Sequence, residues 1–270
     1  MIKTHKYKSV DGTPLEGILS LPSRARWFAM MLHGITVDKN EWNGFYEEMA
    51  GYLYQRGVGT FRFDFRGHGQ SGGSSLDVSI LGDVLDIIAS TREISTLWQK
   101  PLSIVATSFG AGPAIFAAKQ LESRVNRLVL IAPVLDYGMT FLKPVTPWAK
   151  NSFTRQALAK VSSNGYLLLD GHFKLSARLI EEFKWLQPWR ALQSLSKPVL
   201  LIHGDRDSMV PFGASRKYFC RKDAWKFVRL AGADHGYATV GDESGNSKAS
   251  VANKHRILEE IENFIVGGAK

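Results

Sequence analysis

The sequence predicts an α/β fold in which a mostly parallel, doubly wound sheet carries helices on both faces. Short continuous apolar runs alternate along the chain with longer segments whose apolar residues recur at helical spacing. Strands that are apolar throughout are typical of a sheet buried on both faces, and strand–helix alternation predicts crossover helices between parallel strands. The chain has 270 residues, of which 44% are hydrophobic and 22% charged, so it can form one such sheet and is not typical of a disordered protein.

The expected elements follow one another in a regular order. Strands are expected at residues 15–22, 27–34, 58–65, 102–107, 127–133, 198–204 and 225–232, and amphipathic helices at 41–56, 77–98, 109–121 and around 257–265. Residues 134–188 interrupt this order, because they show no clear strand, contain Pro144 and Pro147 and are rich in aromatic residues. We therefore predict a core formed by residues 1–133 and 189–270, with a helical cap inserted at 134–188.

Composition excludes several classes of protein. The formal net charge is +9, but the basic residues are scattered without a basic run, so nucleic-acid binding is not expected. No apolar run approaches the roughly 18 residues of a membrane-spanning helix. The single cysteine, Cys220, cannot form an internal disulfide, and no signal peptide is recognised, so a cytoplasmic location is expected. Neither a dinucleotide fingerprint nor metal-ligand spacing is found, so no cofactor and no metal are expected.

Two serines compete for the role of nucleophile. Ser71 occupies the literal G-x-S-x-G pattern, but it lies in a glycine-rich loop with no helix directly after it. Ser108 lies where the strand at 102–107 runs straight into a helix, and a sharp turn in this context exposes a serine hydroxyl. Gly110 supplies the small residue that such a turn needs two positions later. Taken alone, Ser108 is equally well interpreted as the N-cap of a helix.

Partners for Ser108 occur later in the chain. A serine hydroxyl reacts only when a base removes its proton, and the base must be oriented by a third group. His235 and Asp207 each follow an expected strand, so both side chains should meet Ser108 at the carboxyl edge of the sheet. Asp205 is the alternative acid, and we favour Asp207.

Acyl transfer also needs backbone N–H groups that stabilise the negative charge on the carbonyl oxygen. Phe109, directly after the nucleophile, and Ile35, in the loop after the strand at 27–34, are the expected donors. The remaining histidines and charged residues near these motifs are expected to be structural, to lie at the surface or to point elsewhere: His33, Asp64, Arg66, His68, Asp234 and His255.

These motifs resemble the α/β-hydrolase superfamily. The matching segments are HGIT (33–36), FDFRGHGQSGG (63–73), ATSFGAG (106–112), LVLIAP (128–133), LLIHGDRDSMVP (200–211) and AGADHGY (231–237), in the family's order. The resemblance implies that Ser108 is the nucleophile, His235 the general base and acid, and Asp207 its partner, with Ile35 and Phe109 as oxyanion donors. Ala106 departs from the glycine usual at its position.

The expected function is hydrolysis of small-molecule carboxylic esters with an apolar acyl or aryl group, by a monomer or a homodimer. Within the superfamily, the sequence is most similar to the cinnamoyl/feruloyl esterases and to the monoacylglycerol-lipase or serine-aminopeptidase-like group. The aromatic residues of the cap would form pocket walls, although packing of the cap onto the core explains most of them. Two alternatives remain open: an acyl thioesterase that uses the same residues, and a non-catalytic binding protein that keeps the fold.

Overall fold

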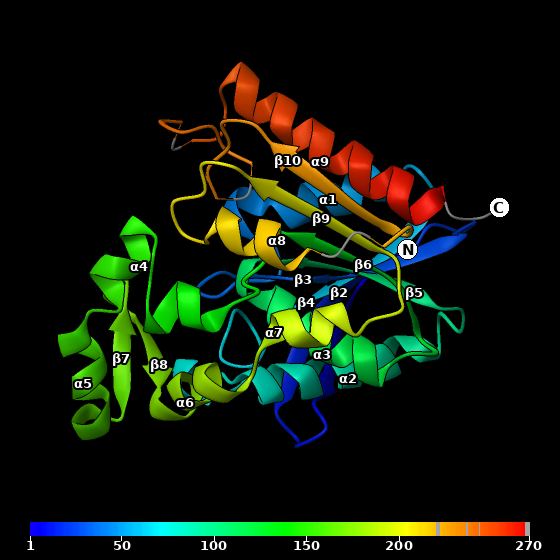
Figure 1. Ribbon diagram of the computed structural model, residues 1–270. Coiled ribbons are helices and arrows are strands. Elements are labelled where there is room, and N and C mark those ends of the chain that lie inside the picture. The colour runs from blue at the N-terminus through cyan, green and yellow to red at the C-terminus, as the bar shows by residue number, and fades with distance from the viewer. Residues whose placement is uncertain (220–221, 236, 243, 268–270) are drawn as a thin grey trace.

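The computed structural model describes residues 1–219, 222–235, 237–242 and 244–267, so the predictions made for Cys220 lie outside the described residues. Its centre is an eight-stranded sheet with the strand order β1-β2-β4-β3-β5-β6-β9-β10 (Figure 1). The strands are β1 (Ile2–Lys8), β2 (Pro14–Ser20), β3 (Trp27–Leu32), β4 (Val58–Phe63), β5 (Leu102–Thr107), β6 (Val125–Ile131), β9 (Val199–Gly204) and β10 (Trp225–Leu230). Strand β2 pairs antiparallel with β1 and β4, and the other neighbours pair parallel.

The prediction of a mostly parallel sheet is thus confirmed, but the edge strand β1 was not predicted. Its residues Ile2–Lys8 pair with Ser20–Pro14 and are exposed or only partly buried. An edge strand of this kind has no continuous apolar run, which is the signal by which the buried strands were found.

Helices cover both faces of the sheet, as predicted. Helices α1 (Phe45–Tyr54) and α9 (Lys248–Val266) pack on one face, and α2 (Ile80–Ser95) and α3 (Ala111–Gln120) on the other (Figure 1). The short helices α7 (Pro188–Gln193) and α8 (Phe212–Tyr218) pack with α2 and α3 and were not predicted. They contain six and seven residues, too few to show helical periodicity.

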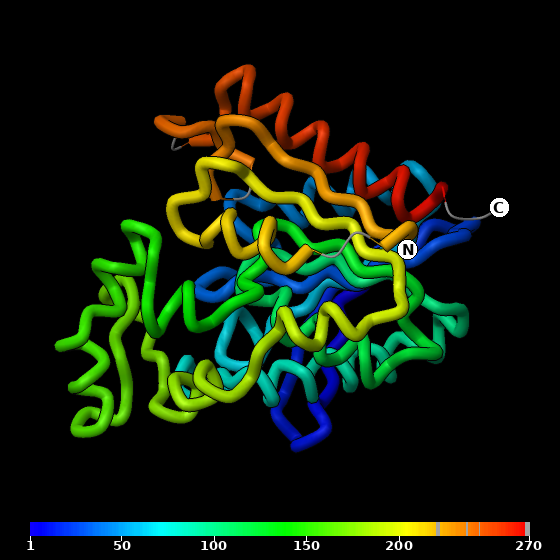
Figure 2. The backbone as a smooth tube through the Cα atoms, in the orientation of Figure 1, coloured from blue at the N-terminus to red at the C-terminus, as the bar shows by residue number. Residues whose placement is uncertain are grey.

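Residues 134–188 follow β6 and precede β9 in the sequence. In space they project beyond one end of the main sheet (Figure 2). They form a π-helical turn (Gly138–Leu142), α4 (Pro147–Ser152), α5 (Arg155–Asn164), β7 (Tyr166–Leu169), β8 (Phe173–Ser176) and α6 (Ala177–Trp185). The expectation that this segment contains no strand is wrong, because β7 and β8 form an antiparallel hairpin. Asp170 and Gly171 have φ values of 50° and 76°, the left-handed conformation that makes Asp-Gly a hairpin signal.

None of the helices in the part of the chain that the structure describes is both long enough and apolar enough to cross a lipid bilayer.

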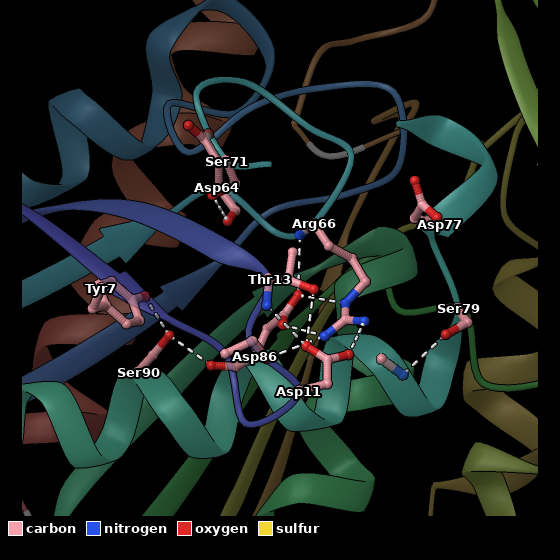
Figure 3. A network of polar contacts seen from close by, with 12 residues as sticks. Tyr7, Asp11, Thr13, Asp64, Arg66, Ser71, Asp77, Ser79, Asp86 and Ser90 are labelled. Atoms are coloured by element: carbon pink, nitrogen blue, oxygen red, sulfur yellow. Dashed lines mark hydrogen bonds and ion pairs between the residues drawn. The ribbon is translucent and has the colours of Figure 1, made fainter. Parts of the chain in front are cut away.

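Helix α2 carries two buried aspartates in opposite surroundings. Asp86 accepts hydrogen bonds from Arg66, at 2.7 Å from Nη2 to Oδ1 and 3.0 Å from Nε to Oδ2 (Figure 3). The Oδ1 atom of Asp83 is buried and has no hydrogen-bond partner among the described residues. Burial, reinforced by the negative charge of Asp86, raises the pKa of Asp83 well above its ordinary value. Asp83 therefore holds a proton in the folded protein at pH values where it loses that proton in the unfolded chain.

Replacement of Asp83 by Asn is expected to stabilise the protein at neutral pH. Because the folded-state pKa of Asp83 is raised, its contribution to the free energy of unfolding falls as pH rises above about 4, the ordinary pKa of aspartate. Asn has a similar shape and no proton to lose, so the variant should gain stability over the wild type as pH rises. Urea unfolding at pH 5 and pH 8 measures this difference.

The matched variant is Asp86→Asn, which removes the charge from a carboxylate that is paired. It should lower the free energy of unfolding by roughly 3 kcal/mol, because the buried Arg66 would keep only its ion pair with the exposed Asp11. An Asp83→Asn protein that is less stable than the wild type at pH 8 would contradict the assignment of a neutral Asp83.

Candidate active site

The turn at Ser108 connects β5 to α3 through one turn of 3₁₀-helix, Ser108–Gly110. Ser108 has a φ of 52°, in the left-handed region that costs energy for any residue with a side chain. Gly110 is required because a Cβ at this position would lie 2.3 Å from the carbonyl oxygen of His33. Ala106 is buried in the core cluster within β5. The turn is therefore strained and packed tightly against the end of β3.

The structure brings Ser108, His235 and Asp207 together from the ends of three different strands. The Nε2 atom of His235 lies 3.1 Å from the Oγ of Ser108, and its Nδ1 lies 2.8 Å from the Oδ2 of Asp207. These side chains follow β10, β5 and β9, whose parallel arrangement places their carboxyl ends at one edge of the sheet. A serine hydroxyl, an imidazole and a carboxylate in this order can move a proton from the serine to the histidine.

Burial and charge set the ionisation of the histidine and its carboxylate. Burial opposes ionisation of Asp207, but the charge of His235 and hydrogen bonds from His203 and His235 outweigh it and hold the pKa of Asp207 below its ordinary value. Burial likewise favours neutral His235, but the charge and hydrogen bond of Asp207, with a smaller contribution from Glu41, raise the pKa of His235 above its ordinary value. Asp207 therefore remains an anion, and His235 becomes a stronger base.

The hydrogen bonds of the two neighbouring acids are with groups other than the imidazole of His235. Asp205 accepts hydrogen bonds from Arg229 Nε at 2.7 Å and from the backbone N–H of Gly232 at 2.8 Å. Asp234 accepts hydrogen bonds from the backbone and side chain of Ser208, both at 2.8 Å. Both acids are thus engaged elsewhere.

Most of the residues expected to be structural are buried and contact other residues of the protein interior. The Nε2 of His33 accepts a hydrogen bond from the backbone N–H of Phe65 at 3.0 Å, and burial lowers the pKa of His33 to about 4, so the ring is neutral. Asp64 pairs with Lys39, 2.6 Å between Oδ2 and Nζ. The hydroxyl of Ser71 donates to the carbonyl of Asp64 at 2.6 Å and has no part in the arrangement around Ser108. The other members of this set behave as follows: Arg66 pairs with Asp86 and Asp11, His68 is buried against Phe173, and His255 is exposed.

The loop after β3 lies directly against Ser108. A Cβ added to Gly34 would meet the Cβ of Ser108 at 3.3 Å, and Ile35 and Phe109 line the same cavity as Ser108. The carboxylate of Glu41 accepts a hydrogen bond from the backbone N–H of Gly34 at 2.8 Å and thereby fixes this loop. Desolvation raises the pKa of Glu41.

Ser108 and His235 open into a cavity of about 430 Å³ with mostly apolar walls. Residues 134–188 contribute Val134, Phe141 and Trp148 to the walls, and the β3 loop contributes Ile35 and Val37. Among the described lining residues, the side chains that ordinarily carry a full charge at neutral pH are acids: Glu41, Asp234 and Asp242. None of the lysines and arginines that give the chain its net charge of +9 is among the described residues that line this cavity.

Sequence reasoning missed two residues that contact the site. His203, on β9, lies 3.1 Å from Asp207 through its Nε2 atom. Glu41 supports the β3 loop, as described above. A polar side chain at the end of an otherwise apolar strand was the available signal for His203, whereas a lone glutamate in a loop gave no signal for Glu41.

Comparisons with known proteins agree with this architecture. Residues 23–186 match the family model described as serine aminopeptidase, S33. The uncharacterized protein YfhR of Salmonella typhimurium is 25% identical over 242 residues, which cover 85% of this chain and 73% of that protein.

Solved structures share the fold at low sequence identity. Est1E from Butyrivibrio proteoclasticus, solved with ferulic acid bound, has a TM-score of 0.72 at 21% identity and covers 94% of this chain and 98% of its own. Alpha/beta hydrolase domain-containing protein 10 from mouse has a TM-score of 0.73 at 18% identity, with coverage of 97% and 98%. These likenesses show the α/β-hydrolase fold. Because the family model matches more than half of its length, the chain belongs to the serine aminopeptidase S33 family of α/β hydrolases.

Proposed function

We propose that this hydrolase cleaves carboxylic esters of small molecules through an acyl-enzyme formed on Ser108. The observation that carries the proposal is the continuous chain of hydrogen bonds from Ser108 through His235 to Asp207 at the wall of an apolar cavity. The strained backbone of Ser108 supports it, because strain of this kind is typical of residues held in place for a reaction.

In the proposed mechanism, Ser108 Oγ attacks the acyl carbonyl carbon while His235 Nε2 takes the hydroxyl proton. His235 then gives this proton to the leaving alcohol as the acyl-enzyme forms. A water molecule, deprotonated by the same nitrogen, attacks the acyl-enzyme, and the acid leaves as Ser108 regains its proton. Asp207 holds the Nδ1–H of His235 and stabilises the imidazolium present in both halves of the reaction.

Stabilisation of the negative charge that develops on the carbonyl oxygen is assigned to the backbone N–H groups of Ile35 and Phe109. The close packing of Gly34 against Ser108 and of Gly110 against the carbonyl of His33 supports this assignment, because it holds the loop after β3 beside the turn that carries Ser108. Donors fixed before the reaction stabilise the oxyanion without a cost of reorganisation.

The walls of the cavity favour a neutral substrate with an apolar acyl or aryl group. Its apolar lining and the acids Glu41, Asp234 and Asp242 disfavour a substrate that carries a negative charge close to the scissile bond. The ferulic acid bound to Est1E supports aryl esters as first candidates. The same acids weigh against the acyl-CoA form of the thioesterase alternative.

Matched substrates test the reaction class. The oxygen ester, thioester and amide of one aryl acid and of one medium-chain fatty acid should be compared by kcat/KM. We expect the oxygen esters to be turned over fastest. Faster turnover of the thioesters or amides would assign the protein to the corresponding class instead, and no turnover by folded protein would support the binding-protein alternative.

Replacement of Trp148 by Ala is expected to change the acyl-chain preference. Trp148 lines the cavity from α4, so its removal leaves room for a longer acyl group. We expect kcat/KM for long-chain esters to rise relative to short-chain esters by roughly tenfold, the scale on which hydrophobic pockets discriminate methylene groups. The matched control is Trp185→Ala, because Trp185 is 80% exposed at the end of α6. An unchanged preference in Trp148→Ala would contradict the prediction that Trp148 limits the length of the acyl group.

A further inference from the structure

The carboxylate of Asp207 has donors on both oxygens. Oδ1 accepts hydrogen bonds from the backbone N–H groups of Met209 at 2.9 Å and Val210 at 2.7 Å. Oδ2 lies 2.8 Å from His235 Nδ1 and 3.1 Å from His203 Nε2. One carboxylate oxygen is therefore shared by two imidazoles, and the proposed mechanism uses only one of them.

His203 is fixed on every side. It is the fifth residue of β9 and is fully buried, with its ring edge-on to Phe212 at 5.5 Å between centroids. Its Nδ1 lies 2.7 Å from the Oγ of Ser215, which is fully buried on α8. A carboxylate can only accept, so His203 Nε2 donates its hydrogen to Asp207. In the neutral ring, Nδ1 then accepts the hydroxyl hydrogen of Ser215, which selects this tautomer.

We propose that Ser215 and His203 form a second, buried arm of hydrogen bonds on Asp207, and that His203 is a positioning residue that sets the basicity and orientation of His235. This inference rests on the proposed function of Ser108, His235 and Asp207. The chain of contacts runs from Ser215 through His203, Asp207 and His235 to Ser108, with 2.7, 3.1, 2.8 and 3.1 Å between successive donor and acceptor atoms.

The arm acts through the charge on Oδ2. Two N–H donors divide the negative charge of this oxygen, so each receives a weaker hydrogen bond than it would alone. Without His203, the two backbone donors would keep Oδ1 in place, while Oδ2 would have only His235 as a partner. His235 would then become more basic. Its ring would also be held less firmly, because Asp207 would have lost one of the groups that fix its position. The other ionisable groups that act on His235 are Glu41 and Asp234, which the change leaves in place.

The test compares His203→Leu, which removes the arm, with His203→Gln, whose amide can donate to Asp207 and accept from Ser215. In the pH profile of kcat/KM for an ester, the midpoint of the acid limb should lie about half a pH unit higher in His203→Leu than in the wild type. The shift follows because a more basic His235 loses its proton only at higher pH. The plateau of kcat should fall roughly tenfold from the lost orientation, with KM unchanged. His203→Gln should restore both values toward those of the wild type.

A merely structural role for His203 would lower the thermal midpoint without moving the acid limb, so an acid limb at the wild-type pH in folded His203→Leu would overturn the inference. If His203→Leu does not fold, Ser215→Ala tests the same arm, and we expect a smaller shift in the same direction. Titration of the His235 ring by NMR in a Ser108→Ala background gives the same shift without turnover. Failure of the arm is therefore distinguishable from failure of Ser108 as the nucleophile.

Discussion

Replacement of Ser108 by Ala is expected to lower kcat for ester hydrolysis by on the order of 10⁶-fold, the scale found when a serine nucleophile is removed. The variant removes the atom that forms the acyl-enzyme and leaves His235 and Asp207 without a partner to activate. Ala retains the Cβ at the strained φ of 52°, so the fold and its stability should change little. Steady-state turnover of an activated aryl ester, with circular dichroism to verify folding, measures both expectations.

The matched control for this variant is Ser71→Ala, which alters the serine of the literal G-x-S-x-G pattern. Ser71 donates to the carbonyl of Asp64 and accepts from the backbone N–H of Glu16, so its loss should cost about 1–2 kcal/mol of stability. Its turnover should remain close to that of the wild type. If Ser71→Ala lost activity in the folded state while Ser108→Ala kept it, the choice between the two serines would be reversed.

Replacement of Asp207 by Asn is expected to lower kcat by about 10⁴-fold. The backbone N–H groups of Met209 and Val210 would hold the amide oxygen of Asn, so the amide nitrogen would face His235. That nitrogen donates hydrogen bonds, which forces His235 to carry its own hydrogen on Nε2. The nitrogen that faces Ser108 could then no longer accept the hydroxyl proton. The same ester assay, with urea unfolding to compare stability, measures the loss.

Asp205→Asn is the control, because Asp205 lies two residues before Asp207 and pairs with Arg229 instead of His235. Its turnover should stay close to that of the wild type. A large loss in Asp205→Asn together with a small loss in Asp207→Asn would show that the acid has been assigned to the wrong residue.

Much of the fold could be predicted because the buried strands and helices carry their own signals. Strands such as β5 and β9 are mostly apolar and buried throughout, and α1, α2 and α9 show helical spacing of apolar residues. The missed elements lack such signals, because β1 is an edge strand and β7 and β8 have only four residues each. The β7–β8 hairpin did have a local signal, the Asp-Gly pair at 170–171, which the search for strand patterns passed over.

The candidate site followed from chain order and strand ends, since loops after parallel strands share one edge of the sheet. Their positions after strands, their order along the chain and the resemblance to α/β-hydrolase motifs were together the basis for predicting that Ser108, Asp207 and His235 meet there. The contacts of Glu41 with Gly34 and of His203 with Ser215 could not be predicted in this way. They depend on side-chain directions within the packed protein, which no periodicity in the sequence encodes.

The most direct test of the account is the reaction of the protein with a fluorophosphonate probe, measured by intact mass for the wild type and Ser108→Ala. Such a probe is attacked by a serine that a neighbouring base has activated. The account predicts one adduct on the wild type, mapped by peptide analysis to Ser108, and no adduct on Ser108→Ala. An unlabelled, folded wild type, or a Ser108→Ala variant that still forms the adduct, would contradict it.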